Sequence, residues 1–137
     1  MTNNVHLTIT EKDEKLDLFS EKINFDMRNK NFRSKNQVQM KSTSFRLNSN
    51  GFDLFQNSNG VNELIFSKAA FEENNASKNS FYGEADLIIY KSPSDTFTLK
   101  GSAEIKFEST LISAEEIEFN FKTKKIISSK RSKIIKS

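Results

Sequence analysis

Apolar and polar residues alternate along most of the chain in short runs with a period of two. The clearest example is LKGSAEIKFESTLISAEEIEF, residues 99–119, in which two such runs follow each other. Side chains of a β-strand point alternately to opposite faces, so each run predicts a strand with one buried face. Further runs of this kind occupy residues 5–10, 23–27, 38–40, 45–47 and 52–55.

Turn signals separate the predicted strands. The Asn-Gly pair in NSNG, residues 57–60, favours a tight hairpin because both residues tolerate positive φ angles. Pro93 in SPSD, residues 92–95, fixes its own φ and favours a second turn. Helical spacing is not sustained over roughly ten residues anywhere, although SKAAFEENNASK, residues 67–78, is ambiguous. About ten short strands, spaced roughly 8–12 residues apart, indicate an all-β sandwich, barrel or roll.

The chain also contains an internal repeat. Shifted by 65 residues, segment 23–55 lies on segment 88–120 without a gap. Eight of the ten apolar residues from Ile23 to Leu54 then meet an apolar residue, where composition alone gives about four. Two related units, each with one apolar face, can bury those faces against each other. The 137 residues, 35% of them hydrophobic, are enough for one such domain.

Positive charge is concentrated at the C-terminus. Seven of the 21 Lys and Arg residues lie from Lys122 onward with no acidic residue among them, which leaves 14 basic against 18 acidic residues elsewhere. A basic terminus can contact nucleic acid or anionic lipid headgroups. The basic residues are not spread through the aromatic strands, so we expect no nucleic-acid partner. We interpret residues 1–129 as one domain and residues 130–137 as a flexible basic tail.

Residues that could carry catalysis or bind a metal are few. His6 is the only histidine and the sequence has no cysteine, so a histidine triad or a thiolate metal site lacks partners. Glu115 and Glu116 are neighbours on a predicted strand, where their carboxylates point to opposite faces. We therefore expect no enzymatic activity, no metal site and no cofactor.

Short motifs recur at regular spacing in the second unit. They are GEA at residues 83–85, the strand ending in Tyr90, LKGSAEI at residues 99–105 and ISAEEI at residues 112–117. Together with Ala69 and Phe71 upstream, these motifs make residues 18–129 similar to the OstA-like periplasmic lipopolysaccharide-transport family. That family includes LptA, LptC and the N-terminal domain of LptD. Ser102 and Glu115 stand where the family usually has Asn and Asp.

The resemblance implies a twisted β-jellyroll of short antiparallel strands, built from the two related units and stacked as two sheets. Such a roll carries lipopolysaccharide, or a similar lipid, from the inner to the outer membrane. Its apolar interior holds the acyl chains and shields them from water. The implied protein partners are other OstA-like rolls, which are LptC-like, LptD-like or copies of this chain, joined by pairing of edge strands. We expect the docking edges near Thr8 and Ile127.

The resemblance also implies a periplasmic location. Residues 1–20 show no signal peptide, which we expect to have been removed or to be absent from this sequence. The sequence contains no apolar run long enough for a membrane-spanning helix, so we expect no direct membrane span.

Apolar positions on the inner faces of the predicted strands form the expected lipid-facing wall. They are Phe25, Phe32, Met40, Leu47, Phe52, Tyr90, Phe97, Ile105, Ile112, Ile117 and Phe119. Periodicity does not distinguish an open groove for acyl chains from a closed core. The alternative function is therefore a structural β-repeat module that uses the same edges without lipid cargo. The sequence also leaves open whether the protein is an LptA-like bridge or an LptC-like adaptor.

Overall fold

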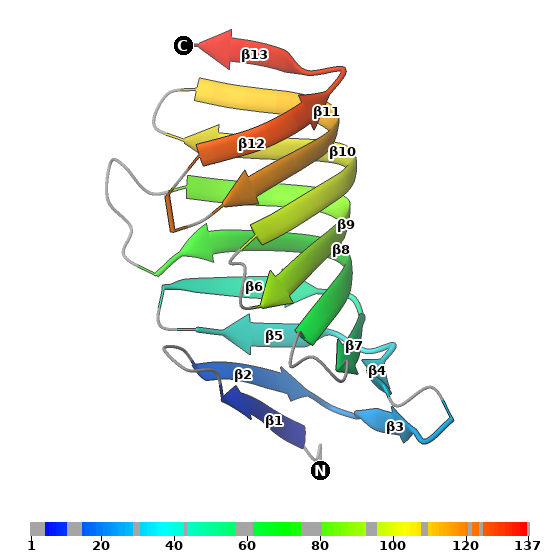
Figure 1. Ribbon diagram of the computed structural model, residues 1–137. Helices are drawn as coiled ribbons and strands as arrows, with labels where there is room; N and C mark the ends of the chain where they lie inside the picture. The colour runs from blue at the N-terminus through cyan, green and yellow to red at the C-terminus, as the bar shows by residue number, and fades with distance from the viewer. Residues whose placement is uncertain are drawn as a thin grey trace.

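The computed structural model is an open roll of antiparallel strands (Figure 1). It describes residues 5–10, 15–28, 31–42, 44–56, 62–74, 81–92, 96–107, 110–120, 122–123 and 125–136. The strands are β1 (Val5–Thr10), β2 (Lys15–Ser20), β3 (Asn24–Asp26), β4 (Asn31–Ser34), β5 (Val38–Lys41), β6 (Phe45–Ser49), β7 (Phe52–Gln56), β8 (Asn62–Glu73), β9 (Phe81–Ser92), β10 (Thr96–Phe107), β11 (Thr110–Asn120), β12 (Lys125–Lys130) and β13 (Lys133–Lys136). The predicted all-β fold is confirmed.

Four long strands, β8 to β11, run through both sheets of the roll. The first half of β8 pairs with β7, whereas its second half pairs with β6. In the same way, the first half of β11 pairs with β13 and its second half pairs with β12. One sheet, called the first sheet here, therefore runs from β1 through β2, β5 and β6 to β13. The other, called the second sheet, runs from β3 through β4 and β7 to β12.

The chain bends sharply where the long strands pass from one sheet to the other. Lys68, Ser102 and Arg131 have positive φ angles of 46°, 47° and 51°, and Gly101 has 80°. Glycine adopts such angles without steric cost, which suits it to the corner of β10. A Cβ atom on Gly101 would also lie 2.8 Å from Oδ2 of Asp86. The backbone angle and the close carboxylate together require glycine at this corner.

Cross-strand residue pairs of the first predicted unit recur 65 positions later in the second unit. Met40 lies opposite Leu18 and Leu47. Sixty-five positions later, Ile105 lies opposite Gly83 and Ile112. The Phe25–Phe32 pair of β3 and β4 is likewise repeated as Tyr90–Phe97 in β9 and β10. The repeat in the sequence is therefore a repeat of strand register.

The units differ in the continuity of their strands. Three pairs of short strands in the first unit, β2/β3, β4/β5 and β6/β7, correspond to the continuous strands β9, β10 and β11. Ser20, Ser34 and Ser49 are buried at the breaks. The equivalent positions in the second unit, 65 residues later, hold Ala85, Leu99 and Ala114.

Hydroxyl groups stabilise the broken strands because they bond to the backbone freed there. Ser49 Oγ donates to Gly51 O at 3.0 Å, and Asn36 N donates to Ser34 Oγ at 3.1 Å. The apolar residues of the second unit offer no such bond, and their strands continue through the bend. The prediction of short strands throughout was therefore wrong for β8 to β11, which have 11 or 12 residues each.

The basic C-terminus belongs to the sheets. The expected domain boundary at residue 129 falls inside β12, and Lys133–Lys136 forms β13. Ile134 lies opposite Ile112 of β11, and Lys133 lies opposite Ser113. The backbone of the first half of β11 needs a partner on this side, and β13 supplies it. Residues 130–136 are thus the last edge of the roll.

Candidate functional site

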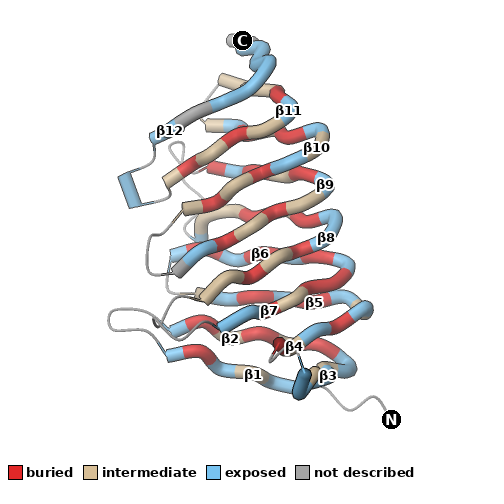
Figure 2. Tube along the Cα trace, turned by 45° about the vertical axis from the view of Figure 1, so that its right-hand side comes forward, coloured by how far each residue is buried: buried red, intermediate tan, exposed pale blue. Residues whose placement is uncertain are grey.

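The interior between the two sheets contains most of the predicted lipid-facing wall. Eight of its eleven residues are buried in one hydrophobic cluster, namely Met40, Leu47, Phe52, Tyr90, Phe97, Ile105, Ile117 and Phe119. Phe32 and Ile112 are partly buried and pack against that cluster. Figure 2 shows buried and exposed residues alternating along the strands of the roll. Alternation in the sequence thus identified the interior face correctly for these ten residues.

Phe25 does not lie in the buried interior. Its side chain is 52% exposed in β3, a three-residue edge strand whose single neighbour is β4. Its ring centroid lies 4.7 Å from that of Phe32. The expectation of an interior position was wrong because, among the described residues, no strand lies beyond β3 to cover the ring. Phe25 instead marks the open end of the second sheet.

Aromatic rings fill the middle of the interior around Phe97. Its ring stacks on Phe71 at a centroid distance of 4.3 Å. Phe45 and Tyr90 meet the same ring edge-on, each at 5.0 Å. All four side chains are at most 1% exposed. In the described part of the chain, the interior is therefore a packed core, and an acyl chain has to displace these rings to enter it.

Six of the eight large apolar residues that are exposed in the described part of the chain lie at the two ends of the roll, and the other two, Phe55 and Tyr82, lie on β7 and β9 between the ends. At the end formed by β1 and β3, Val5, Phe25 and Met27 are exposed, Met27 by 81%. At the opposite end, Ile127 and Ile134 are 56% and 59% exposed, and Ile126 is exposed beside them. The apolar interior thus continues into an exposed apolar edge at each end.

The predicted docking residue Thr8 lies on a regular edge strand. β1 pairs with β2 alone, without a bulge, from Val5 opposite Ser20 to Thr10 opposite Lys15. Thr8 Oγ1 donates to Asp17 Oδ1 at 2.9 Å on the exposed face. The backbone edge of β1 on the side away from β2 has no strand beside it among the described residues, so it can accept a further strand.

The second predicted docking residue, Ile127, lies at an irregular position. In β12, Ser128 lies opposite Glu118 and Ile126 lies opposite Phe119, so Ile127 is the extra residue of a β-bulge. Bulges on edge strands disturb pairing with a further strand. The neighbouring edge strand β13 has a regular register over four residue pairs. Sequence analysis missed this edge because residues 130–137 were interpreted as a tail, although KIIK carries a short apolar run.

The only histidine forms a small polar cluster beside β1. His6 Nε2 lies 2.8 Å from Asp17 Oδ1, and its ring stacks on Phe19 at a centroid distance of 4.3 Å. The hydrogen bond from His6 lowers the pKa of the Asp17 carboxyl below its ordinary value of 3.8, and desolvation opposes this effect. A second hydrogen bond, from Thr8, lowers that pKa further. The cluster links β1 to β2 on the exposed face.

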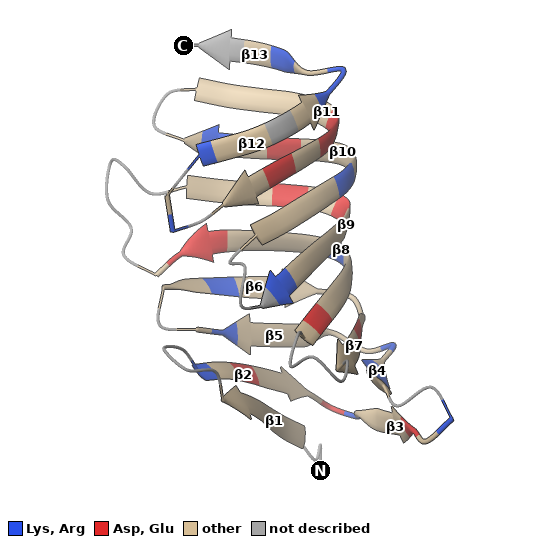
Figure 3. Ribbon diagram, viewed as in Figure 1, with Lys and Arg blue, Asp and Glu red and all other residues tan. Residues whose placement is uncertain are grey.

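The glutamates at the C-terminal end take separate cationic partners. Arg131 Nη1 lies 3.1 Å from Glu115 Oε1, and Lys130 Nζ lies 3.4 Å from Glu116 Oε2. Both cations are on the edge formed by β12 and the turn after it, where Figure 3 shows blue segments. These exposed pairs hold the end of β12 against β11 and do not form a paired-carboxylate site.

The described residues contain neither a metal-binding cluster nor a membrane-spanning helix. No group of three or more His, Cys, Asp or Glu side chains comes together there. The same residues contain no helix of the length and apolarity needed to cross a bilayer.

Comparison with known proteins gives a family and a fold. Residues 17–125 match the family described as LptA/(LptD N-terminal domain) LPS transport protein. No curated protein matches the sequence. The chain is similar in structure to LptH of Pseudomonas aeruginosa, the LptA homologous periplasmic component of the lipopolysaccharide transport device, with a TM-score of 0.77 at 15% identity. That similarity covers 89% of this chain and 94% of LptH, and it confirms the predicted jellyroll.

Proposed function

Because this chain belongs to the LptA/LptD N-terminal-domain family of lipopolysaccharide transport proteins, we propose that it carries lipopolysaccharide, or a similar lipid, across the periplasm. The acyl chains lie between the two sheets, against the predicted wall. The observation that carries this proposal is the apolar interior that reaches an exposed apolar edge at both ends. Valine, phenylalanine and methionine are exposed at one end and isoleucines at the other, and such apolar edges fit an interior that continues into a neighbouring molecule.

Acyl chains can enter the packed interior if the two sheets move apart. The sheets are joined through the bends of β8 to β11, and no strand pairing closes β1 or β3 onto β12 or β13 among the described residues. Separation of the sheets therefore breaks side-chain contacts, such as Phe71 on Phe97, and leaves the ladders intact. Burying one CH₂ group contributes about 0.8 kcal/mol, so one long acyl chain gains on the order of 8–10 kcal/mol toward this opening.

Neighbouring rolls supply the path beyond each end. We propose that β1 and β13, the regular edges of the first sheet, each pair with an edge strand of another family member. Backbone hydrogen bonds then provide affinity, and the exposed Val5 and Ile134 side chains are covered in the joint. Partners of this kind are LptC-like, LptD-like or further copies of this chain.

Photo-crosslinking tests the lipid cargo. A photoreactive phenylalanine analogue replaces Phe32, Phe97 or Ile112 in turn, and the same analogue at Arg46, which is exposed on the outer face, is the control. Adducts with lipopolysaccharide from the interior positions and none from Arg46 support the proposal. Folded variants that give no adduct from any of the three interior positions would contradict it.

The alternative function is that of a structural module without lipid cargo. The close packing of the core is the observation that favours this function over lipid transport. Phe97, Tyr90 and Ile117 are fully buried by the protein's own atoms. In that case the edge strands still form complexes, but no interior position gives adducts in the crosslinking experiment. Complex formation and lipid adducts are therefore measured on the same variants.

A further inference from the structure

A second candidate site lies on the outer face of the roll, away from the interior. Three adjoining hollows follow the broken bend of the first unit, and together they are called the outer groove here. The largest, of about 630 Å³, extends across β5, β6, β8 and β9 to Ser102 of β10. It shares Gln37 and Gln39 with a hollow of about 430 Å³, which shares Asn36 with one of about 400 Å³.

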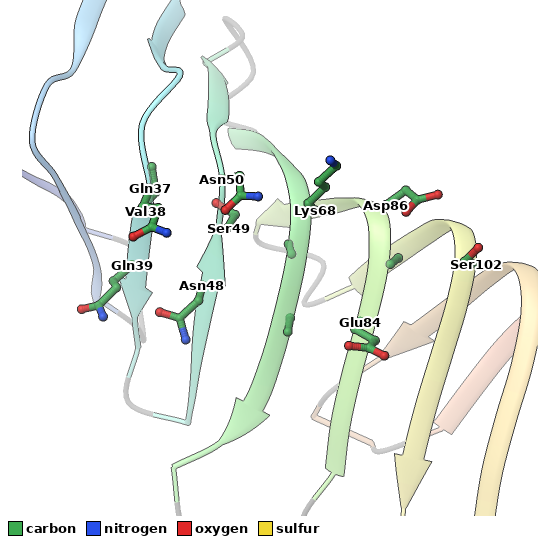
Figure 4. A pocket seen from close by; sticks show the side chains of 13 residues that line it. Gln37, Val38, Gln39, Asn48, Ser49, Asn50, Lys68, Glu84, Asp86 and Ser102 are labelled. Carbon is green, nitrogen blue, oxygen red and sulfur yellow. The ribbon is translucent and has the colours of Figure 1, made fainter.

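Amide and carboxylate side chains line the wide part of the outer groove. Gln39 and Asn48 stand on the neighbouring strands β5 and β6, and Glu84 stands on β9, beyond β8. Lys68, Asp86 and Ser102 lie at the bend beside them (Figure 4). Asn48 and Glu84 both lie opposite Ala70, one on each side. The small side chain of Ala70 leaves space between the two polar residues. A row of amides and carboxylates around such a space can exchange hydrogen bonds with a ligand rich in hydroxyl groups.

The other end of the outer groove is cationic. Lys22, Arg33 and Lys35 line the smallest hollow together with two asparagines. Arg33 Nε lies 3.2 Å from Asp53 Oδ1, but neither lysine has an ion-pair partner within the described part of the chain. Two uncompensated ammonium groups beside amide donors suit a phosphate group, whose oxygens accept charged hydrogen bonds.

The charges along the outer groove limit what can occupy it. Glu84 and Asp86 at the wide end repel a polyanion such as a nucleic acid, whereas Lys22 and Lys35 attract a single anionic group at the narrow end. The ligand that fits both ends has one phosphate and a neutral, hydroxyl-rich part.

The broken strands hold the groove in shape. Ser20 Oγ donates to the carbonyl of Gln37 at 3.1 Å, and Ser34 Oγ accepts from the amide of Asn36 at 3.1 Å. Residues 35–37, which contribute side chains to all three hollows, are thus fixed from inside. In the second unit β10 passes the equivalent bend without a break, and the two smaller hollows are lined by residues of the first unit.

From these observations we propose that the outer groove binds a phosphorylated saccharide. The phosphate lies between Lys22 and Lys35, and the sugar hydroxyls bond to Gln39 and Asn48. The saccharide comes either from the headgroup of a glycolipid or from a free phosphorylated sugar. The site goes beyond the proposed transport function, because it does not use the interior.

NMR titration of the ¹⁵N-labelled protein with N-acetylglucosamine 6-phosphate tests the proposal without any acyl chain. We expect saturable shifts at the amides of Asn36, Gln39 and Asn48. The double variant Lys22→Glu/Lys35→Glu should weaken binding at least tenfold, whereas Lys100→Glu/Lys106→Glu, an equal charge change on two exposed residues outside the groove, should not. Absence of shifts in the groove, or equal weakening by both variants, overturns the proposal.

Partial ligands test the two ends of the groove separately. Asn48→Ala should weaken binding of the sugar phosphate several-fold and leave binding of inorganic phosphate unchanged. If inorganic phosphate binds as tightly as the sugar phosphate, the saccharide part of the proposal is wrong.

Competition distinguishes the two sources of saccharide. Displacement of the sugar phosphate by intact lipopolysaccharide assigns the site to glycolipid headgroups, and displacement by deacylated lipopolysaccharide alone assigns it to free saccharides. Displacement by neither overturns the proposal. If the sugar phosphate does not bind, crosslinking of lipopolysaccharide to position 97 can still succeed. The saccharide site and the proposed lipid transport are therefore tested independently.

Discussion

The hydroxyl groups of Ser20 and Ser34 lie 2.9 Å apart inside the protein, where β2 and β4 end at the bend. Both residues are at most 5% exposed. Fourteen positions separate them in the chain, and their hydrogen bond joins two of the three strand breaks of the first unit. This side-chain hydrogen bond thus connects the two chain segments of the broken bend, where β9 and β10 of the second unit continue as unbroken strands.

Removing one of these hydroxyls should destabilise the fold. Ser34→Ala leaves the buried Ser20 hydroxyl and the Asn36 amide with fewer partners, so we expect a loss of about 1–3 kcal/mol in the free energy of unfolding. Ser67→Ala, at an exposed serine of β8, is the control and should have almost no effect. Urea denaturation measures both. Because the two serines share one bond, Ser20→Ala/Ser34→Ala should cost less than the sum of the single changes, and simple additivity would contradict the bond.

A methyl group at Gly83 should strain the aromatic core. A Cβ atom there would lie 2.5 Å from two ring carbons of Phe71, and that ring is already stacked on Phe97. We expect Gly83→Ala to reduce stability by about 1–3 kcal/mol. A double-mutant cycle with Phe71→Leu checks the cause, since the smaller side chain relieves the clash. If the effects of Gly83→Ala and Phe71→Leu simply add, the clash is not the source of the loss.

The polar cluster at β1 should respond to acid. His6 lowers the pKa of the Asp17 carboxyl in the folded protein, so the ionised form is favoured by folding. This contribution to stability is present above the ordinary Asp17 pKa of 3.8 and is lost as the pH falls through the lower, folded value. We expect His6→Gln to raise the Asp17 pKa toward its ordinary value, with a smaller rise for Thr8→Val. NMR titration of the carboxyl carbon measures these shifts, and an unchanged pKa in His6→Gln would refute the assignment.

Pairing through β1 should be sensitive to proline. Backbone N–H groups of successive residues in an antiparallel strand point to opposite sides. Of the neighbours Leu7 and Thr8, one therefore directs its N–H group away from β2, and proline at that residue removes the donor that a docking strand would use. We expect one of Leu7→Pro and Thr8→Pro to abolish complexes with family partners while circular dichroism shows a folded monomer. Thr8→Val keeps the backbone donor and should retain complexes. Complexes that survive both prolines would exclude β1 as a docking edge.

Proline should affect complex formation differently at the two edge strands of the C-terminal end, β12 and β13. β13 has a regular register, whereas β12 carries a bulge at Ile127. Ile134→Pro should therefore weaken complex formation much more than Ile127→Pro. Size-exclusion chromatography with a purified partner roll compares the two variants. A stronger effect at Ile127 would restore β12 as the docking edge.

Much of the fold could be predicted from local patterns. Alternation with a period of two placed Met40, Ile105 and Phe119 on the inner face, because the direction of a side chain in a strand depends only on its position. The 65-residue repeat likewise predicted related units, and the register of Met40 and Ile105 bears this out. The exposure of Phe25 could not be predicted in this way, because it depends on which strands flank β3, and within the described ranges β4 alone does so.

By itself, the sequence determined the class of fold, the two related units and the apolar face of most strands. These are properties of single strands or of one unit compared with another. The tertiary structure alone decided where strands break, as at Ser20 and Ser34. It also decided that Ile127 is the extra residue of a β-bulge and that Lys133–Lys136 pairs as an edge strand. It also decided that the interior is packed around Phe97. Each of these depends on which distant segments meet across the sheets, and the period of a single strand carries no information about that.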